Sequence, residues 1–278
     1  MRINPVLTKE LRERFRTPKT ALMIILYLLV IGGFSLGFIY MSMRDSTGYF
    51  QPWNNREIFS VLSVAQLILL AFVIPGLTAG TISGERERQT LNVLLTTKLT
   101  PFGIIVSKML SSCGFTVLLM IASLPLYCVV FIFGGISPGQ IAGLMGFYLV
   151  TVFLFASVGM ACSTYFKRTG VSTVTAYGII FLIGGGTGFL AGFLWQFYRT
   201  QFLTETPLVV QFLQDINPVM VLLRILGVEA VFGKDRELLL PYWSIYTSVW
   251  LLIGSLFITW AVYRLNPQQR AKGFLFRL

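Results

Sequence analysis

The spacing of glycine and lysine near residue 230 comes close to that of a phosphate-binding loop but does not match it. Such a loop has four residues between two glycines, and Lys and then Ser or Thr follow the second glycine. Here five residues separate Gly227 from Gly233, and Asp235 follows the lysine. A second glycine cluster, residues 184–188, contains no lysine. The sequence therefore predicts that this chain has no nucleotide site and binds no cofactor.

Acid–base and metal chemistry also lack their usual residues. The chain has no histidine, which excludes imidazole metal sites and histidine proton relays. Its three cysteines lie within long apolar segments, where we interpret them as small buried hydrophobic residues. Solvation is the favoured interpretation, and cation binding the alternative, for five carboxylates near one another in the sequence: Glu205, Asp215, Glu229, Asp235 and Glu237. We expect no catalytic residue and no metal site, so the chain is not predicted to be an enzyme.

The elements that must position these residues are membrane spans. The chain is 55% apolar and 12% charged, whereas soluble domains are about a quarter charged. Crossing the hydrocarbon core takes about 20 predominantly apolar residues. Six segments meet this requirement: 21–41, 58–82, 102–134, 141–166, 171–197 and 242–264. The sequence predicts an all-α integral membrane protein with six transmembrane helices.

The distribution of positive charge predicts the topology. With the N-terminus in the cytosol, sixteen of the 22 Lys and Arg residues fall on the cytoplasmic side and six on the other. Such a bias is typical of cytoplasmic loops and places both termini in the cytosol. The net charge of +11 is then a topology signal, and we expect no nucleic acid partner.

Residues 4–17 predict an amphipathic helix on the inner membrane surface. Leu7, Leu11 and Phe15 recur every four residues, and charged residues such as Arg12 lie elsewhere around the helix. Such a helix would offer a surface to a cytosolic partner. The alternative is a solvated basic leader.

Proline and glycine mark sites of bending or close packing within the spans. Pro75-Gly76, near the inner end of the second span, predicts a kink. Small residues in the fifth span predict close helix packing or a hinge with local unwinding. These residues are Gly184, Gly185, Gly186 and Gly188.

Residues 206–232 contain two apolar stretches that are too short to cross the membrane. We predict a pair of short helices that enter the outer leaflet and return, broken at Asn217-Pro218. Facing lipid would be costly for Arg224 and Glu229, so we expect both to face water or a partner.

A charged segment, residues 84–97, lies between the second and third spans. Glu85, Arg86, Glu87 and Arg88 lead into an i, i+3, i+4 apolar stripe. The stripe consists of Leu91, Leu94 and Leu95. This pattern predicts a helix that lies flat and offers one face to a cytosolic component.

Two interpretations of this segment compete. The helix could lie on lipid headgroups, but a headgroup binder would favour Lys and Arg alone. Glu85 and Glu87 oppose an anionic surface, which favours docking to a protein.

A secondary transporter normally keeps ionisable residues at membrane depth. The uncharged runs within the six spans contain none, and Gln66 and Gln196 with some hydroxyls are their main polar groups. This argues against ion coupling and for energy supplied by another subunit.

The stretch Gly84-Glu85-Arg86-Glu87-Arg88-Gln89-Thr90-Leu91-Asn92-Val93-Leu94-Leu95-Thr96-Thr97 resembles the cytoplasmic segment between spans two and three of bacterial ABC exporter permeases of the type 2 family. The opening Asn4-Pro5-Val6-Leu7 is similar to the interfacial helix of that family, and Asn217-Pro218-Val219 to a pair found before its last span. The resemblance covers nearly the whole chain.

The resemblance implies a multi-pass subunit of the bacterial plasma membrane that pairs with a second permease, as a homo- or heterodimer surrounded by lipid. Each permease docks a separate cytosolic ABC ATPase, which binds the ATP. The segment 84–97 is then the coupling helix. Residues 85–88 and Thr90 supply polar contacts, and the three leucines supply a buried anchor. Leu11, Arg12 and Phe15 of the interfacial helix extend the contact.

The sequence leaves the transported cargo open. The apolar spans favour a hydrophobic or amphipathic cargo. The competing interpretation is a regulatory or mechanotransmitting complex, in which ATP hydrolysis moves an extracellular partner and no cargo crosses. The loop 42–57 is too short for the large extracellular domain that some relatives carry.

Overall fold

The computed structural model describes residues 8, 10–12, 15–45, 52–91, 100–132, 137–199, 206–227 and 241–266. Every regular element in these ranges is a helix: α2 (Pro18–Asp45), α3 (Pro52–Thr78), α4 (Ser83–Glu87), α6 (Pro101–Ile132), α7 (Pro138–Tyr165), α8 (Thr169–Phe181), the π-helix η1 (Leu182–Gly186), α9 (Thr187–Arg199), α10 (Leu208–Ile216), α11 (Pro218–Ile225) and α12 (Tyr242–Leu265). Six of the described stretches are long and apolar enough to cross a membrane. The prediction of an all-α integral membrane protein is confirmed.

Proline begins several of the helices. Pro18, Pro52, Pro101, Pro138 and Pro218 are the first residues of α2, α3, α6, α7 and α11. At that position the missing N–H is not needed for a helical hydrogen bond, and the fixed φ already suits a helix. The sequence thus marks the start of five helices directly.

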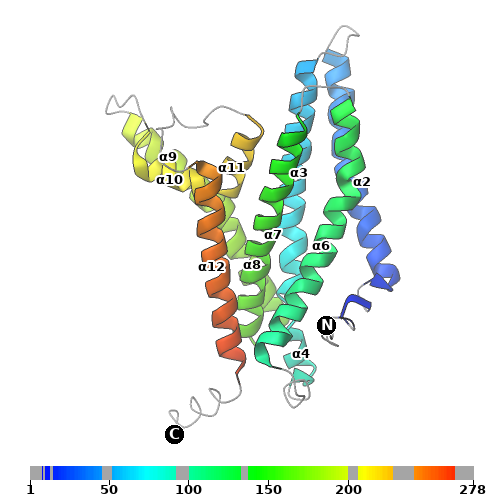
Figure 1. Cartoon of the computed structure of the whole chain (residues 1–278), viewed down its shortest axis with the longest axis vertical. Coiled ribbons are helices and arrows are strands. Elements are labelled where there is room, and N and C mark those ends of the chain that lie inside the picture. Colours follow the sequence, from blue (N-terminus) through cyan, green and yellow to red (C-terminus); the bar gives the residue numbers. More distant parts are fainter. Residues whose placement is uncertain are drawn as a thin grey trace.

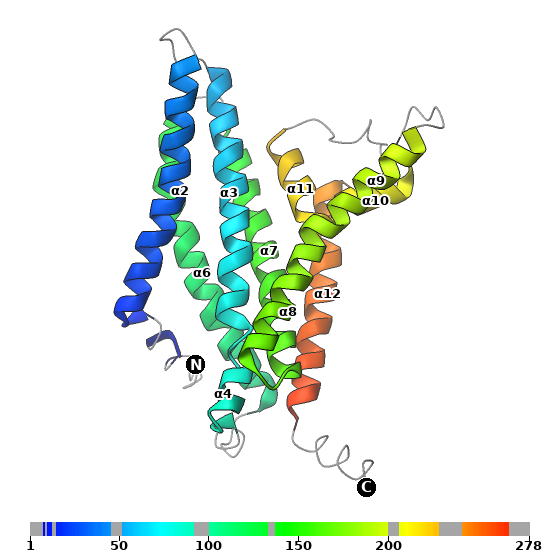
Figure 2. The ribbon, with the colours of Figure 1, turned by 180° about the vertical axis from the view of Figure 1, so that it is seen from behind.

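The helix α7 lies at the centre of the bundle (Figure 1). It packs against α12 and α6 as well as α3 and α8, and α2 packs on α3 and α6 at one side. The run α8–η1–α9 crosses in front of α7 in the view from behind, and α9 leans outward beyond η1 (Figure 2). We call the end of the bundle that carries α4 the α4 end, and the opposite end, with α10 and α11, the α11 end.

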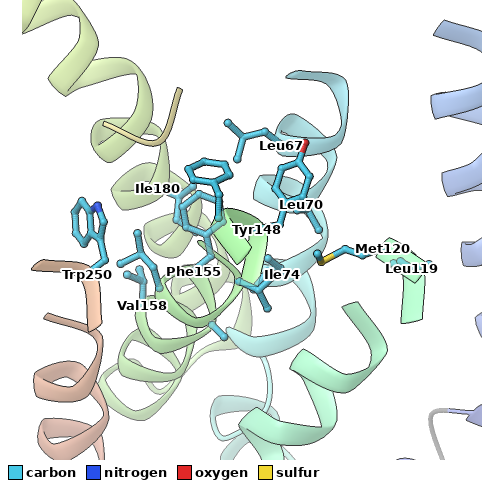
Figure 3. Packing of buried hydrophobic residues seen from close by; sticks show 14 of the residues in the cluster. Leu67, Leu70, Ile74, Leu119, Met120, Tyr148, Phe155, Val158, Ile180 and Trp250 are labelled. Atoms are coloured by element: carbon cyan, nitrogen blue, oxygen red, sulfur yellow. The ribbon is translucent and has the colours of Figure 1, made fainter. Parts of the chain in front are cut away.

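The core between α3 and α7 combines apolar contacts with buried hydroxyl groups. Leu70 and Ile74 of α3 lie beside Tyr148 and Phe155 of α7, and Trp250 of α12 approaches α7 from the other side (Figure 3). The Tyr148 hydroxyl donates to a backbone carbonyl of α3, that of residue 63, over 2.8 Å. Such bonds join helices in an environment where no water satisfies polar groups.

A small residue lets α7 approach α3 closely. A Cβ atom added to Gly159 would lie 1.9 Å from Oγ1 and 2.9 Å from Cβ of Thr78.

The interpretation of all three cysteines as buried is wrong for Cys128, which is exposed, whereas Cys162 is buried and Cys113 half-buried. A thiol facing lipid remains in apolar surroundings, so hydropathy alone does not separate the two positions.

The glycine cluster of the fifth span lies in the π-helix η1, which contains Gly184, Gly185 and Gly186, while Gly188 follows in α9. In the second span, Pro75 lies inside α3. A Cβ atom on Gly76 would lie 3.1 Å from the hydroxyl oxygen of Tyr177, so this glycine lets α8 approach α3.

The short helices α10 and α11 meet at 86°, and the break lies at Asn217. The expectation that Arg224 faces water or a partner is wrong, as is the solvated interpretation of Asp215. These two side chains form an ion pair in which they are only 10% and 1% exposed. Mutual neutralisation makes such burial tolerable next to a membrane. Glu229 lies outside the described residues.

Candidate functional site

The candidate site is the α4 segment, residues 83–91, at the α4 end of the bundle (Figure 1). The helix α4 covers only Ser83–Glu87, so one continuous helix over 84–97 is wrong for its described part. Gln89 has a left-handed backbone with φ of 60°. Its N–H donates to the carbonyl of Arg86, and the Thr90 N–H donates to the carbonyl of Glu85. This pair of bonds is a Schellman motif, which ends a helix.

Glu85 joins this segment to the N-terminal segment through a lysine of α6. Lys108 Nζ lies 2.6 Å from Glu10 Oε1 and 3.4 Å from Glu85 Oε1. The lysine side chain is only 5% exposed, and the two carboxylates are 16% and 32% exposed. One buried cation therefore holds carboxylates from two separate parts of the chain.

Arg86 joins the segment to the end of α7. Its guanidinium donates to the carbonyl of Phe166 through Nη1 and to that of Thr164 through Nη2, each over 3.0 Å. The last carbonyls of a helix lack partners within the helix and carry partial negative charge. A planar guanidinium reaches both carbonyls at once, which the ammonium of lysine does less well.

Glu87 joins the segment to the beginning of α8. Its carboxylate accepts from the Thr169 backbone N–H over 2.9 Å and from the Thr169 hydroxyl over 2.8 Å. These two bonds lower the pKa of the Glu87 carboxyl, with the hydroxyl bond the larger cause. The carboxylate thus lies against the positive end of a helix dipole, where it is stabilised.

A serine of α7 holds the turn that precedes α4. Ser163 Oγ accepts from the backbone N–H groups of Ile82 and Ser83, over 2.8 and 3.1 Å. Ser172 of α8 donates to the carbonyl of Ala79 over 2.7 Å. The turn between α3 and α4 is therefore bonded to both neighbouring helices.

The outcome differs among the remaining residues of this segment that were predicted to contact a partner. Leu91 is 2% exposed and belongs to the core of this chain, so the prediction that it anchors a partner is wrong. Arg88 and Thr90 are exposed, and so is Gln89 between them, which was not among the predicted contact residues. Leu94 and Leu95 lie outside the described residues.

The N-terminal segment packs on α6 near the same end. Leu11 is half-buried and Arg12 exposed. The ring of Phe15 meets that of Phe115 edge to face, with centroids 6.1 Å apart. Phe15 is still 41% exposed, so part of its ring stays uncovered although the ring contacts α6.

Sequence reasoning missed the internal role of the charged residues. The bonds of Arg86 and Glu87 reach residues about 80 positions further along the chain. The alternation of charge in residues 85–88 carries no signal for the partners of these side chains. The described residues contain no group of His, Cys, Asp and Glu side chains suited to a metal ion.

Comparison with known proteins agrees with this architecture. A model of the ABC-2 family transporter proteins matches residues 4–265. A search of curated proteins gave no match. Permeases of this kind are the membrane components of ABC transporters and associate with ABC ATPase subunits. The match runs from the N-terminal segment to the end of α12, so the chain belongs to the ABC-2 transporter family and is an ABC transporter permease.

Proposed function

We propose that this permease is the membrane subunit of an ATP-driven exporter, in which two permeases pair and each docks a separate ATPase. The α4 segment is the coupling element. The observation that carries this proposal is that the residues of the α4 segment have two different environments. Three charged side chains bind within the permease, while residues 88–90 at its tip are exposed.

This arrangement suits the transmission of movement. A push on the tip reaches α7 through Arg86, α8 through Glu87 and α6 through the ion pair of Glu85 with Lys108. Each contact lies at or near the end of a long helix, so a small displacement there tilts the whole helix. Packed interfaces with discrete arrangements turn small local shifts into larger ones.

The docking surface proposed here differs from the amphipathic stripe of the sequence. The exposed side chains of Arg88, Gln89 and Thr90 form the polar tip that enters the ATPase. Leu94 and Leu95 keep the role of apolar anchor as a proposal. The positive-inside bias supports a cytosolic α4 end, where an ATPase subunit would dock.

The second permease would cover apolar surface that this chain leaves open. In the apolar stretch of the membrane span formed by α2, only 17% of the residues are buried within this chain, and in that of the span formed by α8, η1 and α9 only 11% are. The corresponding share in α6 is 61%. Pairing along these helices would place a passage between two apolar walls. Such a passage favours a hydrophobic or amphipathic cargo.

Affinity purification of the tagged permease from gently solubilised membranes tests the proposal. We expect an ABC ATPase subunit to copurify and the complex to hydrolyse ATP. Recovery of the folded permease without an ATPase, in several mild detergents and after cross-linking in the membrane, would contradict it.

A further inference from the structure

Asn217 lies at the corner between α10 and α11 and bonds to two separate elements. It is fully buried, with 0% exposure. Its amide nitrogen donates to the carbonyl of Gly184 over 2.6 Å and to Thr187 Oγ1 over 2.8 Å. Its amide oxygen accepts from the N–H groups of Val219 and Met220, over 2.8 and 3.1 Å. Two donors and two acceptor positions are the full capacity of an amide side chain.

The nitrogen reaches the fifth span where that span is irregular. Gly184 belongs to the π-helix η1, and Thr187 is the first residue of α9. A π-helix is a rare departure from α-helical bonding, and it occurs frequently at functional sites. An external donor to its carbonyl stabilises the wider turn at the point where the helix has no side chains to support it.

The fit at this point is close. A Cβ atom on Gly188 would lie 3.1 Å from the amide nitrogen of Asn217. By contrast, a Cβ atom on Gly178 in the same span would meet nothing within 4 Å. The glycine at 188 therefore leaves room for the asparagine.

The corner itself is held rigidly. Arg224 of α11 pairs with Asp215 and also donates to Gln214 of α10 over 2.7 Å. On its other side, Trp250 of α12 donates to the carbonyl of Ile216 over 2.8 Å. The corner thus bridges the fifth and sixth spans: α10 packs along α9, and Asn217 adds hydrogen bonds to η1 and to the first residue of α9.

We propose that Asn217 is a positioning residue that holds the π-helical break of span five, so that α9 and the α10–α11 corner move as one body during the transport cycle. When its two bonds to η1 and α9 are broken, the packing of α10 on α9 remains, but the polar contact that fixes the position of α9 at η1 is lost, and α9 tilts about η1 more easily. The transport cycle belongs to the proposed function, but the bonding of Asn217 and its test do not depend on it.

Two substitutions separate this role from simple helix capping. Asn217→Asp keeps an oxygen that caps α11, because Asp is as good an N-cap as Asn. It replaces the donor with an oxygen that faces two acceptors. Thr187→Val removes one of those acceptors and leaves Asn217 in place. Thr175→Val is the matched control, because within the described part of the chain the Thr175 hydroxyl bonds to the carbonyl of Val171 in its own helix and to no other element.

The test measures the distance between spin labels on α9 and α7 by pulsed electron paramagnetic resonance. Labels at Phe193 and Leu149, which are 61% and 50% exposed, suit a permease purified alone in nanodiscs and lacking its three native cysteines. We expect one narrow distance population in the parent protein and in Thr175→Val. Asn217→Asp and Thr187→Val should add a second, displaced population.

The proposal is wrong if Asn217→Asp folds and keeps the parent distance distribution. If that variant does not fold, Thr187→Val decides in the same way. An equal change in Thr187→Val and Thr175→Val would also refute it, because loss of any hydroxyl would then suffice. Gly188→Ala should resemble Thr187→Val, whereas Gly178→Ala should resemble the parent. No ATPase or cargo takes part, so a failed copurification leaves this result independent.

Discussion

Replacing Arg86 by alanine removes both bonds between the α4 segment and the end of α7. A hydrogen bond to a charged group contributes about 1.5–3 kcal/mol. Arg86 is only half-buried, so we take the lower value for each bond. The free energy of unfolding should then fall by about 3 kcal/mol.

A chain of this size loses about 2–3 °C in its unfolding midpoint for each kcal/mol. Arg86→Ala should therefore lower the midpoint by about 6–9 °C, measured by tryptophan fluorescence on the purified permease. Arg86→Lys should recover less than half of the loss, because an ammonium does not reproduce the fork of a guanidinium. Arg88→Ala is the matched control, since this arginine is exposed two residues away. Its midpoint should change by no more than about 2 °C.

Hydrogen exchange locates the effect. Residues 161–168 at the end of α7 should exchange faster in Arg86→Ala than in the parent protein, while the middle of α7 should be unchanged. Arg86 does not stabilise the end of α7 through its guanidinium if Arg86→Ala is as stable as Arg88→Ala, or if Arg86→Lys behaves as the parent does.

Three further predictions concern packing, charge and topology. Gly159→Ala should lower the free energy of unfolding by about 1–3 kcal/mol, because the added methyl group overpacks α7 against α3. Gly146→Ala is the control, because nothing lies within 4 Å of a Cβ atom there, and it should leave the unfolding midpoint unchanged. Equal midpoints for the two variants would contradict the close approach of α7 to α3. Lys108→Met should lower the free energy of unfolding by about 2 kcal/mol in the same assay. This is less than the loss of a fully buried ion pair, because both carboxylates keep some contact with water. A midpoint equal to that of the parent would show that the ion pair does not stabilise the fold. In a background without native cysteines, a cysteine at Gln89 should react with a membrane-impermeant thiol reagent only from the cytosol, and one at Ser137 only from outside; the reverse pattern would overturn the proposed topology.

The spans were predictable from sequence because lipid demands long apolar helices with their backbone satisfied internally. The break at Asn217-Pro218 was predictable for a similar reason, since proline begins a helix well and two short apolar stretches flank it. Both features depend on local sequence. They carry into the structure with little change.

The end of α4 was not predictable from sequence. A left-handed residue at a helix end is most often glycine, and here it is Gln89. The apolar periodicity therefore continued past a point where the backbone turns. Leu91 consequently packs into the core of the chain instead of forming an exposed stripe.

The partners of the charged residues were also out of reach. Glu87 bonds to Thr169 and Arg224 to Asp215, and neither pair has a spacing that a helix repeat would bring together. The hydropathy of the sequence indicated that charged side chains facing lipid near these positions would be energetically costly. It did not show that they are neutralised within the chain.

The proposed function requires that the tip of the α4 segment docks an ABC ATPase. A photo-cross-linking amino acid at Gln89 or Thr90, both exposed, tests this in intact membranes. We predict a cross-linked product that contains an ABC ATPase subunit, and no such product from the same probe at Ser137 at the α11 end. Cross-linking of the ATPase from Ser137 and not from the α4 tip would contradict docking at the α4 segment.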